Sequence, residues 1–236
     1  MAATLAVGAV AGCVEAPPQV TVDDDALAAE EDALAELDLP EVAATSVLRR
    51  AQQVTVRIRS LGCRELGLGS GFVLPGGVVV TNRHVVDQPR EVTVNTWDGR
   101  SFDVDVRGVA VDSDLAILQL DAATDLPVAE LRESPVEIGE SVIAVGYPGG
   151  GPATVSSGEV VALVEGDLLD EPADIIRVDA EIRQGNSGGP LLDEAGRVIG
   201  VVFALDVNSG DGLAVPVDTL LERLEGRSLQ TPVGTC

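Results

Sequence analysis

Three residues in this chain have neighbours that suit nucleophilic catalysis. Ser187 lies among glycines in Gly185-Asn186-Ser187-Gly188-Gly189-Pro190. Glycine adopts backbone dihedrals closed to other residues, so this segment can present a hydroxyl and two backbone N–H groups to one point. His84 is the only histidine of the chain, and Asp114 directly precedes the apolar run 115–118. A serine hydroxyl is a weak nucleophile without an adjacent base, and an imidazole is a suitable base near neutral pH. The three residue types therefore predict a nucleophile, a base and an acid.

Each of these residues has an expected role. We expect His84 to take the proton of Ser187 and to return it later to a leaving amine, while Asp114 orients the ring and stabilises the imidazolium. The backbone N–H groups of Gly185 and Ser187 are expected to form an oxyanion hole. Asp112 is the alternative acid, two residues upstream of Asp114.

The segments that must position these residues read as short strands. Alternating apolar residues, Gly/Pro turns and the Asp98-Gly99 turn signal are typical of antiparallel β-structure. Twelve strands are expected, at 54–59, 72–74, 78–81, 91–96, 102–107 and 115–120, and then at 141–145, 154–164, 175–179, 190–193, 198–205 and 213–217. A polar connector, 121–135, separates the two sets, and 217–225 is typical of a short helix.

The expected fold class is all-β. Two sets of about six short strands predict two six-stranded antiparallel β-barrels with a cleft between them and a short C-terminal helix. The first barrel is expected at about 50–120 and the second at about 136–217, within a domain that covers residues 46–236.

The N-terminal region differs in composition. Residues 1–13 are small and apolar and end in Cys13, which resembles a bacterial lipoprotein signal with a lipid-modified cysteine; a different export signal is the alternative. The run is too short to span a bilayer. Residues 14–45 hold ten acids and no base up to Glu41, which predicts a tether between anchor and domain. An acidic arm that contacts the domain or a partner is the other interpretation.

Composition argues against several functions. The net charge is −24, with 39 acidic residues against 15 basic ones, all of them arginine. Such a field disfavours nucleic acid and anionic lipid headgroups as partners. With one histidine and three dispersed cysteines, no metal site is expected, and no cofactor motif is present.

Several of these segments resemble a known family. The chain order His–Asp–Ser and the motifs Ser70-Gly71-Phe72-Val73, Thr81–Val86, Asp114-Leu115-Ala116 and Gly185–Pro190 resemble trypsin-like (chymotrypsin-fold) serine proteases of the HtrA/DegP group. No PDZ module is expected. Cys63 and Cys236 are similar to those of the MarP group of actinobacterial periplasmic proteases, which are related to acid resistance. The resemblance implies the two barrels, Asp114 as the acid, and a Cys63–Cys236 disulfide, which requires an oxidising compartment.

Substrate contacts are expected around the serine loop. Glu181 lies six residues before Ser187, where trypsin-like enzymes place the floor of the primary pocket, and Gln184 precedes the glycine loop. Glu181 could favour basic side chains there, or it could face solvent or pair with Arg177 or Arg183. Val202, Phe203 and Ala204 are expected to form an edge strand that pairs with an extended substrate backbone.

Together these observations predict a serine endopeptidase that acts on exported or envelope proteins. We expect polypeptide substrates, a location in the cell envelope or periplasm with a lipid anchor, or secretion; the oligomeric state stays open. The alternative is a catalytically weak binding or chaperone-like module on the same fold. Redox or acid gating of the protease is a third hypothesis.

Overall fold

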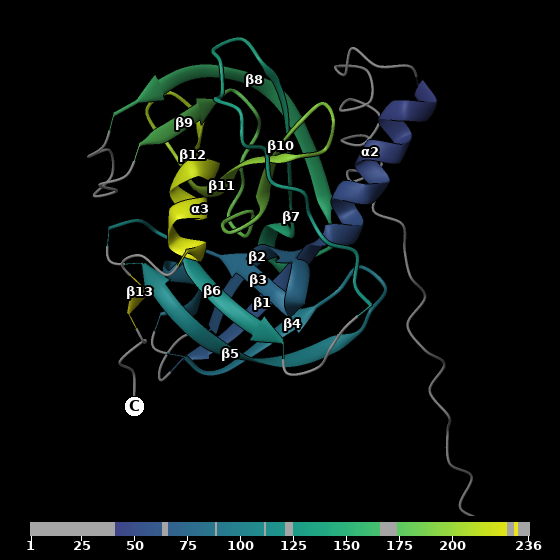
Figure 1. Ribbon diagram of the computed structural model, residues 1–236, viewed down its shortest axis with the longest axis vertical. Helices are drawn as coiled ribbons and strands as arrows, with labels where there is room; N and C mark the ends of the chain where they lie inside the picture. The colour runs from purple at the N-terminus through teal and green to yellow at the C-terminus, as the bar shows by residue number, and fades with distance from the viewer. Residues whose placement is uncertain are drawn as a thin grey trace, which may run out of the picture.

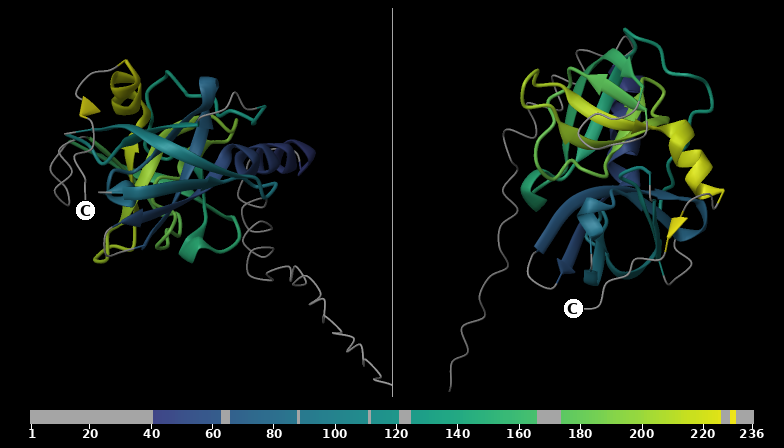
Figure 2. Two further views of the ribbon diagram at one scale, coloured as in Figure 1. Left: turned by 90° about the horizontal axis from the view of Figure 1, so that it is seen from below. Right: turned by 90° about the vertical axis from the view of Figure 1, so that its left-hand side faces the viewer.

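The computed structural model describes residues 41–62, 66–87, 89–110, 112–120, 125–165, 174–225 and 229–230. Twelve of its strands form two β-barrels, one above the other, with a helix beside their junction (Figures 1 and 2). The predicted signal segment, residues 14–40 of the predicted tether, and the three cysteines lie outside the described residues.

The first barrel is closed by a pairing between its outer strands. The strand order is β5-β4-β1-β2-β3-β6, and β5 also pairs with β6, which closes the barrel. The six strands are β1 (Thr55–Gly62), β2 (Leu66–Leu74), β3 (Val78–Thr81), β4 (Pro89–Asn95), β5 (Ser101–Ala110) and β6 (Ala116–Leu120). Two 3₁₀ turns belong to this half, η1 (Pro75–Gly77) and η2 (His84–Val86).

The second barrel is also closed, in the order β10-β11-β12-β9-β8-β7. Its strands are β7 (Ser141–Gly146), β8 (Thr154–Val164), β9 (Ile175–Val178), β10 (Pro190–Asp193), β11 (Val198–Leu205) and β12 (Gly212–Pro216). The 3₁₀ turn η3 (Pro148–Gly150) follows β7, and helix α3 (Val217–Leu224) follows β12. The expected fold class, two six-stranded antiparallel barrels with a short helix, is confirmed.

Aliphatic side chains fill both barrels, as the 2% aromatic content requires. Ile58 and Leu118 are fully buried in the first barrel, and Ile176 and Ile199 in the second. A further cluster, which includes the fully buried Phe72 of β2, contains side chains from both barrels. Apolar burial of this kind is the main favourable term in folding, and here it joins the barrels into one body.

One helix was not expected from the sequence. Residues Glu41–Val54 form helix α2, so the predicted tether boundary at 45 falls inside a helix and Val54 ends that helix rather than starting a strand. Ala44, Leu48 and Ala51, spaced four and three residues apart, are buried on one face. This spacing is typical of one face of a helix. The helix was not predicted, because the acidic stretch just upstream indicated a tether that continues to residue 45.

A short strand was also missed. The two-residue β13 (Leu229–Gln230) pairs with β5, with Leu229 opposite Ala110. Two residues are too few to give an alternating pattern. Among the residues that the structure describes, no helix has the length and apolar character to cross a membrane.

Candidate active site

His84 and Asp114 lie side by side because the strands next to them are paired. His84 lies three residues after the end of β3, and Asp114 lies two residues before the start of β6. The two strands are antiparallel, with Thr81 opposite Ala116. The end of β3 therefore meets the start of β6, and residues 30 positions apart in the chain become neighbours.

Both carboxylate oxygens of Asp114 bind the same histidine. The His84 Nδ1 lies 2.5 Å from Oδ2, and the backbone N–H of His84 donates to Oδ1 at 3.0 Å. The Asp114 side chain is 11% exposed, whereas the imidazole is 50% exposed. A proton on Nδ1, shared with the carboxylate, leaves Nε2 of a neutral ring as a proton acceptor. Asp114 therefore fixes the orientation of the His84 ring, and the ring is placed to act as a base.

The buried Asn82 holds the backbone of Asp114 in place. Asn82 is not among the site residues expected from the sequence. Its Nδ2 donates to the carbonyl of Asp114 at 2.7 Å, and its side chain is fully buried. Asp112, the alternative acid, instead forms an ion pair with Arg223 of α3 at 3.0 Å. Of the two candidate acids, the structure brings Asp114 to the histidine.

A tight turn of glycines presents Ser187. Gly185 has φ +105° and Gly188 has φ +87°, a region that L side chains rarely adopt. The Gly189 N–H donates to the carbonyl of Asn186 at 2.9 Å, which closes the turn. At Gly188 a Cβ atom would also collide with backbone of the first barrel. Glycine is therefore needed at this position both for its dihedral angle and for its size.

The loops that carry His84 and Ser187 meet across β2. A Cβ atom built on Gly69 would lie 2.7 Å from the side chain of Val85, the neighbour of His84, and 3.0 Å from the carbonyl oxygen of Ser187. The next residue, Ser70, donates its backbone N–H to that same carbonyl at 2.8 Å. Residues 84 and 187 thus converge on one short piece of β2.

The hydroxyl of Ser187 donates to the carbonyl of Phe203 at 3.3 Å. Within the described part of the chain, no hydrogen bond joins this hydroxyl to His84. A rotation about the Cα–Cβ bond re-aims a serine hydroxyl, and the hydrogen bonds of catalytic groups often tighten only once substrate is bound. In this structure the serine hydroxyl is therefore directed at β11.

The peptide before Gly185 is fixed by the η3 loop. The carbonyl of Gln184 accepts the Gly149 N–H at 2.9 Å. Because C=O and N–H point in opposite directions in a trans peptide, the Gly185 N–H points away from η3. In the described regions, neither this N–H nor that of Ser187 donates to a protein acceptor. Two backbone donors on one turn are thus free for an anionic oxygen.

Ser70 links the two barrels behind this turn. Its side chain, fully buried, donates to the carbonyl of Gly185 at 2.7 Å and accepts the backbone N–H of Tyr147 at 2.9 Å. Its carbonyl accepts the Thr81 hydroxyl at 2.7 Å. Ser70 belongs to one of the sequence motifs, but the sequence alone predicts no function for it. Only the fold shows that it connects β2, the glycine turn and the residue before η3.

The structure places Glu181 and Gln184 on the surface. The Glu181 side chain is 69% exposed and pairs with Arg183 at 2.9 Å, while Arg177 pairs instead with Asp206 and Asp211. For Glu181 this is the solvent-facing alternative, and it does not provide a buried pocket floor. Gln184 is exposed beside the glycine turn.

The sequence predicts that Val202, Phe203 and Ala204 form an edge strand. They belong to β11, which lies inside the closed barrel between β10 and β12. Its pairing with β10 ends at Val201, opposite Pro190. Beyond that point, Val202 bonds to the glycine turn, donating its N–H to Gly189 at 3.0 Å. Only the end of β11 lacks a neighbouring strand on the β10 side, because β10 is four residues long.

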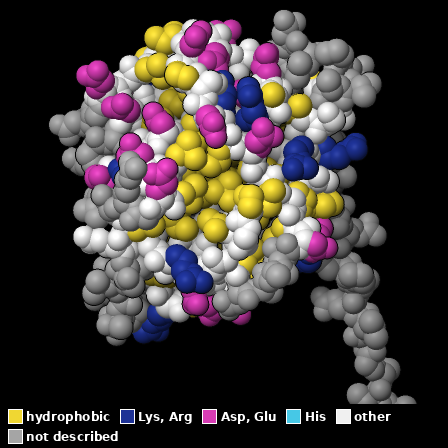
Figure 3. All heavy atoms as spheres, viewed as in Figure 1, with side chains coloured by type: hydrophobic (Ala, Val, Ile, Leu, Met, Phe, Trp, Pro, Cys, Tyr) yellow, Lys and Arg dark blue, Asp and Glu magenta, His cyan; other side chains and the backbone are white. Residues whose placement is uncertain are grey.

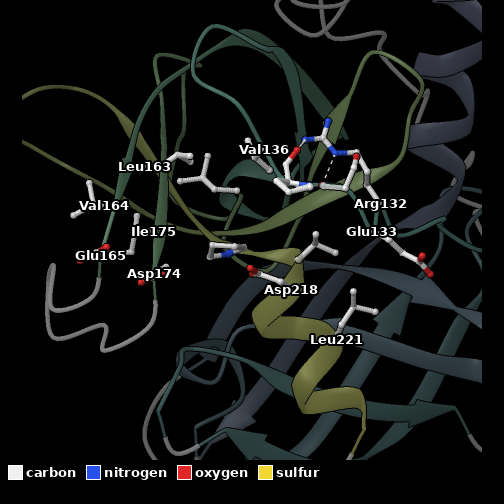
Figure 4. Close-up of a pocket in the computed structure, with 15 residues that line it drawn as sticks. Arg132, Glu133, Val136, Leu163, Val164, Glu165, Asp174, Ile175, Asp218 and Leu221 are labelled. Atoms are coloured by element: carbon white, nitrogen blue, oxygen red, sulfur yellow. Dashed lines mark hydrogen bonds between the residues drawn. The ribbon is translucent and has the colours of Figure 1, made fainter.

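A groove of about 380 Å³ lies elsewhere, between the β8–β9 region, the connector and α3 (Figure 4). Glu133, Glu165, Asp174 and Asp218 line it together with apolar side chains such as Leu163. It shares no lining residue with the Ser187 turn. In the space-filling view, a hydrophobic surface is visible in the middle of this face, with acidic side chains around it (Figure 3).

Arg132 anchors the connector to the second barrel beside this groove. It is buried and forms a two-pronged contact with Glu140, at 2.6 and 3.1 Å. Hydrogen bonding to the guanidinium holds the pKa of Glu140 below its ordinary value. Among the described side chains, no group of three or more His, Cys, Asp or Glu is placed to hold a metal ion.

Comparisons with known proteins show what this chain is similar to. The model of the family "Trypsin-like peptidase domain" matches residues 69–201. The putative serine protease HhoA of Synechocystis is 40% identical over 163 residues, which are 66% of this chain and 41% of that protein. The chain spans about two fifths of the length of the first curated relatives it matches, 41%, 39% and 39%.

Solved structures share the fold. The active form of the Rv3671c protease of Mycobacterium tuberculosis superimposes with a TM-score of 0.73 at 30% identity, over 83% of this chain and 90% of that one. The HtrA-type protease AlgW, solved with a tripeptide, gives a TM-score of 0.72 at 31% identity, over 77% of this chain and 62% of that one. The two-barrel architecture is therefore that of HtrA-type proteases.

Proposed function

Because the chain belongs to the trypsin-like peptidase domain family, we propose that it is a serine endopeptidase. Ser187 is the nucleophile, His84 the general base and Asp114 the orienting acid. The observation that carries this proposal is the pair of hydrogen bonds between His84 and Asp114, with Nδ1 at 2.5 Å from the carboxylate. A carboxylate in this position fixes the ring tautomer that can accept a proton at Nε2.

The proposed reaction begins when the Ser187 hydroxyl turns from the Phe203 carbonyl towards Nε2 of His84. The ring takes the hydroxyl proton as Oγ attacks the substrate carbonyl carbon, and Asp114 stabilises the imidazolium. The ring then gives this proton to the leaving amine as the C–N bond breaks, which leaves an acyl-enzyme. Water attacks the acyl-enzyme by the same route and restores the serine.

The N–H groups of Gly185 and Ser187 receive the oxyanion of the tetrahedral intermediate. Both are free of protein acceptors in the described regions, and the peptide before Gly185 is fixed by η3. Donors that are already oriented need no reorganisation in the transition state, and losing one such donor costs on the order of 100- to 1000-fold in kcat.

For the substrate, we propose an extended polypeptide beside the end of β11, where Val202, Phe203 and Ala204 pass the serine turn. Gln184 is exposed next to this turn, and we propose that it contacts the substrate residues that follow the cleaved bond. Glu181, the carboxylate expected to select basic side chains, is exposed and paired with Arg183, so we do not assign it this role.

The cellular setting is proposed from the sequence. An export signal that ends in Cys13, a lipid anchor on this residue, a Cys63–Cys236 disulfide and exported or envelope proteins as substrates are consistent with one another, since disulfides persist in oxidising compartments. They also agree with a relationship to the MarP group. Mass spectrometry of the mature protein tests the three cysteines together: an unmodified Cys13 or free thiols at the other two would overturn the corresponding part.

Labelling with a fluorophosphonate probe tests the catalytic proposal. The wild type should label at one site, and Ser187→Ala should not label. Ser156→Ala, at a partly buried serine on β8, serves as the matched control and should label like the wild type. Labelling that persists in Ser187→Ala would exclude Ser187 as the nucleophile.

A catalytically weak binding module is the second candidate, and one observation favours it: the Ser187 hydroxyl donates to Phe203 and not to His84. Turnover of fluorescent casein at several pH values separates the two. Hydrolysis that depends on both Ser187 and His84 supports the protease. Casein binding with no hydrolysis at any pH supports the binding module.

A further inference from the structure

A second groove, of about 950 Å³, lies between α2, the β4–β5 turn and the loop that contains η3. Helix α2 contributes Arg49, Gln52 and Gln53 to its lining. Arg57 of β1, Trp97 of the β4–β5 turn and Tyr147 beside η3 also line it. We call this the α2 groove. In Figure 3, basic side chains are visible on the side of the molecule where α2 lies.

The α2 groove is cationic in a strongly anionic protein. None of the described residues that line it is acidic, although the chain has 39 acidic and 15 basic residues. Arg49 makes no ion pair with any residue that the structure describes, and Arg57 donates to the carbonyl of Gly150 at 2.8 Å rather than to a carboxylate. Other arginines, such as Arg132 and Arg177, bind carboxylates. The groove thus holds two arginines that form no ion pair with the described residues.

Its other side chains suit a polypeptide more than a small anion. Gln52 and Gln53 each offer donor and acceptor groups to a peptide backbone. The indole of Trp97 is 49% exposed and offers an apolar face. A single phosphate or carboxylate would occupy little of about 950 Å³. The chemistry therefore fits an extended acidic segment with some apolar side chains.

The chain itself contains such a segment directly before α2. Between Glu15 and Glu41 it has ten acidic residues and no basic one, with leucines at 27, 34, 37 and 39. We propose that the α2 groove binds this acidic arm, residues 14–40, of the same chain. The proposal does not depend on the catalytic assignment.

The covalent connection makes this docking feasible. Arg49 is eight residues after Glu41, so the helix places it about 12 Å further along its axis. About four extended residues at ~3.3 Å each cover that distance on the way back. A tethered segment also acts at an effective concentration in the millimolar range, so weak individual contacts suffice.

The sign of the charge selects between the two grooves. Among the residues that the structure describes, four carboxylates and one arginine line the groove of Figure 4, and this arginine is paired with Glu140. An acidic segment is repelled there and attracted to the α2 groove. The far wall of the α2 groove includes Tyr147 and Gly151, which flank η3, so the docked arm lies against the loop that fixes the peptide before Gly185.

Intrinsic fluorescence of the full chain tests the proposal, because Trp97 is the only tryptophan and lines the α2 groove. Acrylamide quenching is measured at 10 mM and at 1 M NaCl. Since the Debye length falls from about 30 Å to about 3 Å, release of the arm should raise the quenching constant about twofold. Arg49→Glu, and a variant with the nine acids from Glu15 to Asp38 replaced by their amides, should show the high constant at both salt concentrations.

Arg107→Glu is the matched control, because Arg107 is also exposed but lies outside the groove, and it should behave like the wild type. Quenching that is independent of salt in the wild type, or equal in the wild type and the amide variant, would overturn the proposal. Protection that grows with protein concentration would place the arm on a second copy and overturn docking within one chain.

Discussion

The two barrels are alike in architecture but contribute different parts of the site by different means. In the first barrel, His84 and Asp114 meet because β3 and β6 are paired in a fixed register. In the second, Ser187 is presented by a turn in which Gly185 and Gly188 have positive φ. A charged pair needs side chains from rigid neighbouring strands, whereas a nucleophile next to two N–H donors needs unusual backbone. The first barrel supplies the charged pair, and the second supplies the turn that carries the nucleophile.

A buried serine is one of the polar contacts between the barrels. Ser70 is on β2 of the first barrel, yet its hydroxyl binds the Gly185 carbonyl and the Tyr147 N–H of the second. The comparison therefore predicts three kinds of variant: those that damage the first-barrel pair, those that damage the second-barrel turn, and those that loosen their junction.

The largest expected effect is on the first-barrel pair. Asp114→Asn should lower kcat for casein hydrolysis by about 10⁴-fold, because an amide cannot accept from both the backbone N–H and Nδ1–H of His84 and so favours the wrong tautomer. Asp112→Asn is the control: it loses an ion pair with Arg223 and should keep its activity. Equal losses in both variants would mean that the acid has been misassigned.

The second-barrel turn should be sensitive to size as well as to dihedral angle. Gly188→Ala should destabilise the fold by about 2–5 kcal/mol, since strain at positive φ adds to overpacking against Ser70 and Thr81. Gly76→Ala also has positive φ, but a Cβ atom there meets nothing within 4 Å, so about 1–2 kcal/mol is expected. Thermal or urea unfolding measures both. Similar losses would show that the dihedral angle alone decides.

The junction should matter less than either half. Ser70→Ala leaves a buried carbonyl and a buried N–H without their partner and should cost about 1–3 kcal/mol. Ser156→Ala is the control, because its buried hydroxyl has no hydrogen-bond partner among the described residues, and it should be neutral within about 0.5 kcal/mol. If casein hydrolysis by Ser70→Ala stays at the wild-type rate at a temperature where the variant is folded, the junction does not orient the turn.

The smallest expected effect is confined to the second barrel and depends on pH. The hydrogen bond from Arg132 lowers the pKa of Glu140 in the folded state. The stabilisation is therefore fully present above the unfolded pKa and is lost as pH falls through the lowered folded pKa. Glu140→Gln should cost about 1 kcal/mol at pH 7, and the difference from the wild type should shrink below about pH 4. A difference that persists at low pH would point to packing rather than charge.

The sequence located the strands better than the helix before them. Alternating apolar and polar residues, together with turn signals, predicted the strands of both barrels, because a strand with one buried face has an apolar residue at every second position. Helix α2 was missed, although Ala44, Leu48 and Ala51 carry its period, because an acidic, proline-containing stretch precedes it. Which part of β11 has an open edge could not be predicted either, because this depends on which strands pair with it, and no single segment contains that information.

The sequence by itself determined the chemistry available to this protein: one imidazole, one serine among glycines, two candidate acids, a large negative charge and an aliphatic core. The tertiary structure decided which acid meets the imidazole, that Glu181 faces solvent, that Ser70 joins the barrels, and that the arginines at the α2 groove pair with no carboxylate of the described residues. The physical reason is that residue type and local periodicity act within a few positions of the chain. Pairing register, burial and charge neutralisation depend on residues brought together from far apart.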